Sequence, residues 1–200
     1  MFKVIEQAAA CILETLRTDF AAKTPLRIAI DGRCAAGKSL LAECLQEKTG
    51  CTVLHMDDFY LLPNARTKER LQEPGGNVDR ERFWQEVLQP LCRGEAAAYR
   101  RWDCRKQQLE PAVPIAPAPL VVTEGAYSCH PDLWDAYDLH IFLTAGLETR
   151  LARIEKRNGP EALTVFKNKW IPLEEAYFKA FSIEERCALR FCTDAQEKIQ

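Results

Sequence analysis

Eight consecutive residues have the types and the spacing of a phosphate-binding loop. The segment Gly32-Arg33-Cys34-Ala35-Ala36-Gly37-Lys38-Ser39 consists of a glycine, four spacer residues and then Gly-Lys-Ser. Glycines permit backbone conformations that bring amide N–H groups close to a polyphosphate. Lys38 would reach the β- and γ-phosphate oxygens, and the Ser39 hydroxyl would complete the coordination of Mg²⁺. The chemistry indicated is binding of a nucleoside triphosphate, and the alternative is an ordinary glycine-rich turn.

The flanking segments favour the phosphate loop. Leu26–Asp31 is a short apolar run of strand type, and Ser39–Lys48 carries Leu40, Leu41, Cys44 and Leu45 at helical spacing. The loop would therefore join a strand to a helix, whose dipole adds positive potential at its N-terminus. We expect residues 32–40 to bind the nucleotide.

Acidic residues follow two further strand patterns. Thr52–His55 is expected to be a buried strand that ends at Asp57 and Asp58, and Leu120–Thr123 a strand that ends at Glu124. In open α/β sheets, ligands bind outside the carboxyl ends of the strands. Glu124 is thus a candidate Mg²⁺ ligand, directly or through water. The alternatives are a helix cap or turn for the two aspartates and a structural carboxylate for Glu124.

A helix expected over Leu147–Asn158 carries three arginines on one face. Arg150, Arg153 and Arg157 are spaced three and four residues apart. Arginines aligned in this way can clamp a phosphate and neutralise charge on a transferred phosphoryl group. A solvated face shared with nearby glutamates is the alternative. Gly159-Pro160 is expected to break this helix.

The segment between the second and third strands has two candidate binding features. The polar stretch 61–78, broken by Pro63, Pro74 and two glycines, is expected to be a loop, and Asp79 either caps the helix that follows it or binds a ligand. Tyr99–Asp103 mixes aromatic and basic residues, as a recognition surface or a solvated turn would. The prolines between 111 and 119 predict a stiff extended connection.

The remaining patterns complete an α/β fold. Residues 3–20 predict an amphipathic helix, Pro131–Ala136 a short helix, Leu139–Leu143 a fourth strand and Cys187–Cys192 a fifth. Five strands separated by helices predict a parallel sheet that is covered by helices.

Composition limits the class of protein. The chain has 200 residues, a net charge of −2 and a pI near 6.0, which suit one domain and provide no basic surface for general nucleic-acid binding. Nine cysteines without a C-x-x-C pair indicate reduced thiols, and Cys34 is expected to be reachable by thiol reagents. No signal peptide or membrane span is expected, which favours the cytoplasm.

These residues together resemble the uridine kinase family of P-loop kinases. The phosphate loop, Asp57-Asp58-Phe59-Tyr60, the loop leading to Asp79, Glu124-Gly125 and Arg150-Leu151-x-Arg153 occur in that family's order, over about residues 25–192. The resemblance implies a three-layer fold with sheet order 2-3-1-4-5. It implies a single domain over 1–200, with an N-terminal helix 3–20, a phosphate loop 32–39, a substrate region 57–105 and a lid at about 150–165.

The resemblance also implies roles for the residues. Asp57 would be the general base on a ribose 5′-hydroxyl, Asp79 would bind the ribose hydroxyls, and Tyr60 and Tyr99 would neighbour the nucleoside. Lys38, Arg153 and Arg157 would assist transfer, Arg150 would bind the nucleotide, and Ser39 and Glu124 would hold Mg²⁺. The implied activity is ATP-dependent phosphorylation of a small metabolite, without nucleic-acid or membrane partners; homo-oligomerisation stays open.

Other acceptors and another class of protein remain alternatives. Kinases of nicotinamide riboside, pantothenate or phosphoribulose share much of the same skeleton. A GTPase-like switch or a nucleotide-binding regulator is less favoured, because Asn168-Lys169 continues with Trp170-Ile171 and so forms no Asn-Lys-x-Asp motif for guanine. A kinase-derived protein that has lost its substrate is a third alternative.

Overall fold

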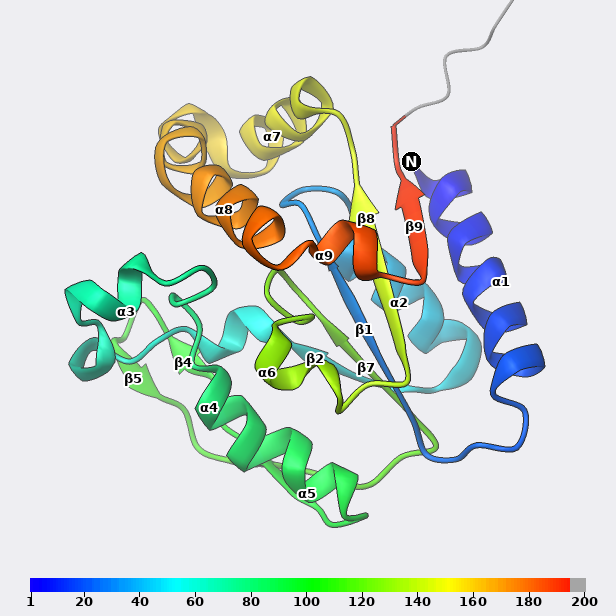
Figure 1. Cartoon of the computed structure of the whole chain (residues 1–200). Coiled ribbons are helices and arrows are strands. Elements are labelled where there is room, and N and C mark those ends of the chain that lie inside the picture. Colours follow the sequence, from blue (N-terminus) through cyan, green and yellow to red (C-terminus); the bar gives the residue numbers. More distant parts are fainter. Residues whose placement is uncertain (195–200) are drawn as a thin grey trace, which may run out of the picture.

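A parallel sheet lies at the centre of the molecule. The computed structural model describes residues 1–194. Within them, β1 (Leu26–Gly32), β2 (Thr52–His55), β7 (Leu120–Glu124), β8 (Leu139–Thr144) and β9 (Leu189–Cys192) form one sheet in the order β2-β7-β1-β8-β9 (Figure 1). All four pairings are parallel. Numbered among themselves along the chain, the strands have the order 2-3-1-4-5, which confirms the prediction.

Helices cover both faces of this sheet because side chains alternate along its strands. Ile28 and Ile30 of β1 face the core shared with α1 (Phe2–Asp19) and α2 (Lys38–Thr49), whereas Ala29 faces the opposite core. The second face is covered by the helical stretch α4 (Arg80–Phe83), η3 (Trp84–Leu88) and α5 (Gln89–Cys92), and by α6 (Pro131–Trp134), α8 (Ile171–Phe181) and α9 (Ile183–Arg186). The predicted three-layer α/β class is therefore confirmed.

Helix α1 packs as its periodicity predicts. Its buried side chains are those of Ile5, Ala8, Ala9, Ile12 and Leu16, and they join one core with α2. No helix in the described residues is both long and apolar enough to span a membrane.

The segment between β2 and β7 has more structure than predicted. The expected loop at 61–78 contains η2 (Pro63–Ala65) and the short helix α3 (Lys68–Gln72), which Thr67 caps. Two small antiparallel pairs follow: β3 (Ala97–Tyr99) with β6 (Val113–Ile115), and β4 (Trp102–Asp103) with β5 (Gln108–Leu109). The proline-rich segment thus forms a short strand, β6, which contains Pro114. A proline is tolerated there because each strand of a two-stranded pair has a free edge.

After β8 the chain forms a long helical segment, α7 (Leu147–Val165) and η4 (Phe166–Trp170), that leads into α8. Gly159 leaves the helical conformation, with φ 84° and ψ 170°. The predicted break at Gly159-Pro160 is therefore confirmed. Helix α8 contacts the phosphate loop, because its Glu174 accepts the Cys34 N–H.

Candidate functional site

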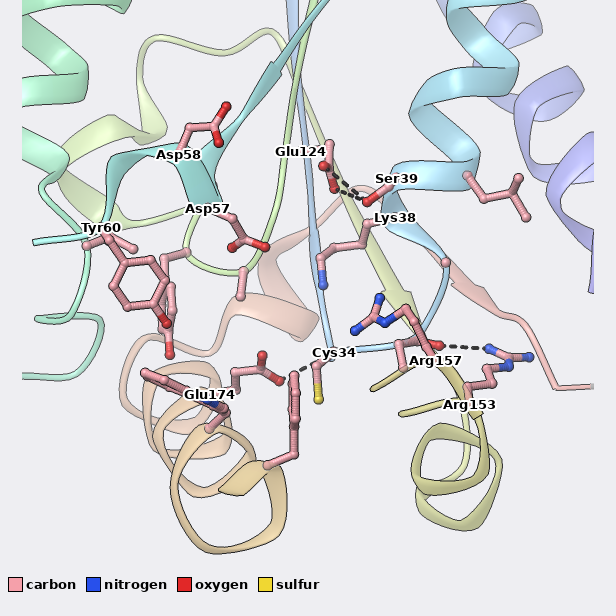
Figure 2. A pocket seen from close by; sticks show the side chains of 18 of the residues that line it. Cys34, Lys38, Ser39, Asp57, Asp58, Tyr60, Glu124, Arg153, Arg157 and Glu174 are labelled. Atoms are coloured by element: carbon pink, nitrogen blue, oxygen red, sulfur yellow. Dashed lines mark hydrogen bonds between the residues drawn. The ribbon is translucent and has the colours of Figure 1, made fainter. Parts of the chain in front are cut away.

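A large cleft opens where β1, β2 and β7 end. Its volume is about 1250 Å³, and its walls come from the phosphate loop, the chain after β2, the β4–β5 hairpin and the segment α7-η4-α8. Cys34, Ala35, Gly37, Lys38, Ser39 and Leu40 line it, whereas Gly32, Arg33 and Ala36 do not. The predicted loop and the predicted carboxylates thus meet in one place (Figure 2).

The loop has the backbone geometry that its glycines allow. Gly32 has φ 135°, and a Cβ there would lie 2.0 Å from the carbonyl oxygen of Leu143. Gly37 has φ 104° and precedes the first residue of α2. The Lys38 ammonium donates to the carbonyl oxygens of Gly32 at 2.7 Å and Arg33 at 3.1 Å. The Lys38 side chain is therefore held over the loop, where it would contact a bound triphosphate.

Buried Asp31, which precedes the loop, fixes its start. One carboxylate oxygen accepts the N–H groups of Gly32 at 2.7 Å and Tyr127 at 3.2 Å. The other accepts the Cys129 N–H at 2.9 Å and the Tyr177 hydroxyl at 2.8 Å. Asp31 is fully buried, and this burial raises its pKa. The four bonds tie the loop, the turn after β7 and helix α8 to one side chain.

Ser39 and Glu124 lie together, as expected for a magnesium site. The Ser39 hydroxyl is 3.2 Å from both carboxylate oxygens of Glu124, which is only 6% exposed and lines the cleft. His55 Nδ1 is 2.6 Å from the same carboxylate, which raises the His55 pKa. No cluster of three His, Cys, Asp or Glu ligands occurs among the described residues. The hydroxyl and carboxylate fit Mg²⁺, a hard cation that keeps water and phosphate ligands of its own.

Asp57 faces the cleft beside Lys38. Its side chain is open to the cleft, but the surrounding walls remove much of its hydration. That desolvation raises the Asp57 pKa, Lys38 opposes the rise, and Glu124 and Asp58 add to it. The raised pKa favours proton uptake, which is what a base near a reacting hydroxyl requires.

Asp58 is held from two sides. Its carboxylate accepts the Tyr99 hydroxyl at 2.6 Å and pairs with Arg101 at 3.1 Å. Tyr99 was predicted to neighbour the substrate, but it does not line the cleft. Its hydroxyl supports Asp58 and the end of β2, and a place for Tyr99 beside the substrate stays a prediction.

Asp79 caps a helix. Its side chain accepts the Arg82 N–H at 3.1 Å at the start of α4 and contacts the Arg82 guanidinium at 3.3 Å. It is not among the cleft-lining residues. Capping, one of the two predicted roles, is confirmed, and direct binding of the ligand is not supported by this geometry.

The three aligned arginines have different surroundings. Arg150 is buried behind the loop, where it donates to the Ala145 carbonyl at 3.1 Å, so its predicted contact with nucleotide is corrected. Arg153 lines the cleft but donates to the carbonyl oxygens of Ala35 at 3.0 Å and Thr193 at 2.7 Å. Exposed Arg157 reaches toward the loop (Figure 2). Of the three, Arg157 is thus the one whose side chain is exposed at the cleft.

Two loop side chains have structural roles. Arg33 turns away from the cleft and pairs with Glu175 and Glu184, each at 2.8 Å. Burial, followed by the nearby Glu174 carboxylate, raises the Cys34 pKa to about 12. This raised pKa does not favour the expected reactivity of Cys34, because the nucleophilic thiolate is scarce at neutral pH.

The wall beyond Asp57 was only partly predicted. Tyr60 lines it as expected, with its ring 5.6 Å from that of Trp170, edge to face. Three further residues of the same wall were not predicted from the sequence: Asn77, Tyr127 and Glu174. One signal was present: Glu174 lies on the face of a helical segment that is otherwise aromatic.

Neither a protein-family profile nor a curated protein matches the sequence, but solved structures do. One is described as a possible uridine kinase, from Bacillus stearothermophilus (18% identity, 94% of this chain, 97% of that chain, TM-score 0.67). Another is described as a candidate fructose transport system kinase, from a Silicibacter species (19%, 94%, 98%, 0.67). A third is D-glycerate 3-kinase from Cryptococcus neoformans (17%, 94%, 94%, 0.67). This chain has the fold of P-loop kinases.

Proposed function

We propose that this protein is a phosphotransferase that moves the γ-phosphoryl group of ATP to a hydroxyl group of a small metabolite. The observation that carries the proposal is the position of Asp57, which faces Lys38 across the cleft beside the phosphate loop (Figure 2). A nucleotide-binding switch needs the phosphate loop but does not need a carboxylate at the position of Asp57. A kinase needs that carboxylate to orient the attacking hydroxyl.

The other residues of the cleft fit this reaction. Loop N–H groups and Lys38 would bind the phosphates, and Arg157 would offset charge on the transferred group. Ser39 and Glu124 would hold Mg²⁺, which neutralises phosphate charge when it is bound. Asp57 would accept the proton of the attacking hydroxyl. Closure of the 150–165 segment over the cleft would exclude water and limit ATP hydrolysis.

A nucleoside such as uridine or cytidine is our preferred acceptor, in a cytoplasmic reaction. The edge-to-face pair of Tyr60 and Trp170 offers aromatic surface for a flat ring next to Asp57. A structural neighbour is described as a possible uridine kinase, which supports the same choice. Nicotinamide riboside, pantothenate and ribulose 5-phosphate are the alternatives to be tested beside it.

The test is ADP release from Mg·ATP with each of these acceptors added singly. We expect one acceptor to increase ADP release, Lys38→Ala to abolish the increase, and Asp57→Asn to lower kcat by about 10²–10⁴-fold with ATP still bound. Asp135→Asn, an equivalent change at an exposed site, is the control. ATP binding without any acceptor-dependent turnover would refute the nucleoside-kinase proposal and leave an untested acceptor or a regulator, and much tighter GTP binding would then favour a switch.

A further inference from the structure

Glu174 places a carboxylate between the phosphate loop and the aromatic wall. It comes from α8, is 6% exposed, and accepts the Cys34 N–H at 2.9 Å through Oε2 (Figure 2). Within the described part of the chain, Oε1 accepts no N–H or O–H bond; the Cys34 thiol and the Lys38 charge are near this carboxylate. Burial of an acidic group costs free energy unless hydrogen bonds satisfy it. One oxygen is therefore fixed by the loop, and the other is available to a donor in the cleft.

The neighbours of Glu174 along the chain show which ligand it would meet. Phe166 and Trp170 precede it by eight and four residues, and all three line the cleft. They lie on one helical face. Tyr177, three residues further on, anchors that face by its bond to Asp31. The helix thus presents aromatic surface and one oriented carboxylate to the same ligand.

Acidic side chains outnumber basic ones on this side of the cleft. Asp57, Asp58, Asp103 and Glu174 line it, against Lys38, Arg101 and Arg105, and Lys38, which would be occupied by the phosphates of a bound nucleotide, is the cation that acts most on Asp57 and Glu174. The Arg101 charge is paired with Asp58. A carboxylate or phosphate on the acceptor would therefore meet like charges at short range, whereas hydroxyl groups would find acceptors.

We propose that Glu174 binds a hydroxyl of the acceptor and, together with Asp57, excludes acceptors that carry negative charge. The acceptor is then a ring-bearing polyol that is neutral or cationic. This inference rests on the proposed function, and it separates the candidate acceptors: uridine, cytidine and nicotinamide riboside fit, whereas pantothenate and ribulose 5-phosphate do not.

Two pairs of acceptors that differ in one charged group provide the test. Uridine is compared with orotidine, and nicotinamide riboside with nicotinic acid riboside, in wild type and in Glu174→Gln. The glutamine oxygen can still accept the Cys34 N–H, so the loop contact is retained. Glu185→Gln, an exposed change on the neighbouring helix α9, is the control. Steady-state kinetics gives KM and kcat, and calorimetry with a non-hydrolysable ATP analogue gives acceptor Kd without turnover.

We expect wild type to prefer the member of each pair without the carboxylate. Glu174→Gln should raise KM for that member by about 10–100-fold, reduce the preference, and leave the Kd of Mg·ATP no weaker. An unchanged acceptor KM and preference, with only thermal stability or ATP affinity altered, would show that Glu174 merely supports the loop. Acceptor binding without turnover would refute the proposed function while still testing Glu174. If no member of either pair binds, the inference that the acceptor is a ring-bearing polyol is overturned.

Discussion

Replacing Tyr177 with phenylalanine tests whether one buried hydrogen bond holds helix α8 to the phosphate loop. The hydroxyl donates to Asp31 at 2.8 Å, and neither side chain is exposed. A hydrogen bond to a charged group contributes about 1.5–3 kcal/mol, and phenylalanine leaves the ring in place. Asp31 keeps three backbone N–H donors, so the expected loss is about 2 kcal/mol. For a chain of this size, that loss lowers Tm by roughly 4–8 °C.

Tyr137→Phe is the matched control for this measurement. The Tyr137 hydroxyl is also buried, but among the described residues it has no partner with good geometry, the Thr123 hydroxyl being the nearest candidate. Its removal should therefore leave stability unchanged or raise it. Thermal and urea denaturation of both variants, with wild type, measure the difference. Equal shifts in Tm for the two variants would refute the reasoning, because the effect would then not depend on Asp31.

Three further outcomes follow from the loop and from buried groups. Gly32→Ala should abolish nucleotide binding in a folded protein, because the added Cβ would lie 2.0 Å from the Leu143 carbonyl oxygen; circular dichroism checks folding and calorimetry checks ATP binding, and normal affinity would contradict the expectation. Burial, and next the charge of Arg80, lower the His130 pKa to about 4, so the folded protein resists protonation while the unfolded chain titrates near pH 6.5. The free energy of unfolding should thus fall as pH drops from about 6.5 to 4, and it should fall less steeply in His130→Asn. Urea denaturation of both proteins over this pH range is the measurement. The same pH dependence in wild type and variant would show that His130 is not responsible. Iodoacetamide at neutral pH should label exposed Cys92 well before Cys34, whose pKa is raised to about 12. Mass spectrometry of the labelled peptides measures the order, and earlier labelling of Cys34 would contradict the expectation.

Local patterns predicted the sheet and the loop because each depends on neighbours in the sequence. The apolar run before Gly32 and the Gly-Lys-Ser that follows specify a strand, a turn and a helix without distant contacts. The acids that end β2 and β7 lie in one cleft, because parallel strands present their carboxyl ends at the same edge.

The arginine face shows what periodicity cannot decide. Arg150 and Arg157 share a helix face, yet one is buried behind the loop and the other is exposed at the cleft. Their difference depends on β8 and α8, whose distances in space no spacing rule supplies. Glu174 was missed for the same reason, because its partner Cys34 is 140 residues away along the chain.

Short strands were also not predicted from the sequence. The strands β4 and β5 have two residues each, too few for an alternating pattern to emerge. They are stabilised by pairing with each other, and their hairpin contributes Trp102 and Asp103 to the cleft wall.

The position of α1 has a practical consequence for work on this protein. Met1 and Phe2 line the cleft, and the Met1 sulfur would lie 3.9 Å from a Cβ at Gly37. Residues that precede Met1, including a purification tag, would therefore emerge at the rim of the nucleotide-binding end. A tag fused there would stand in the path of an entering nucleotide, so kinetic constants should be measured after the tag has been removed.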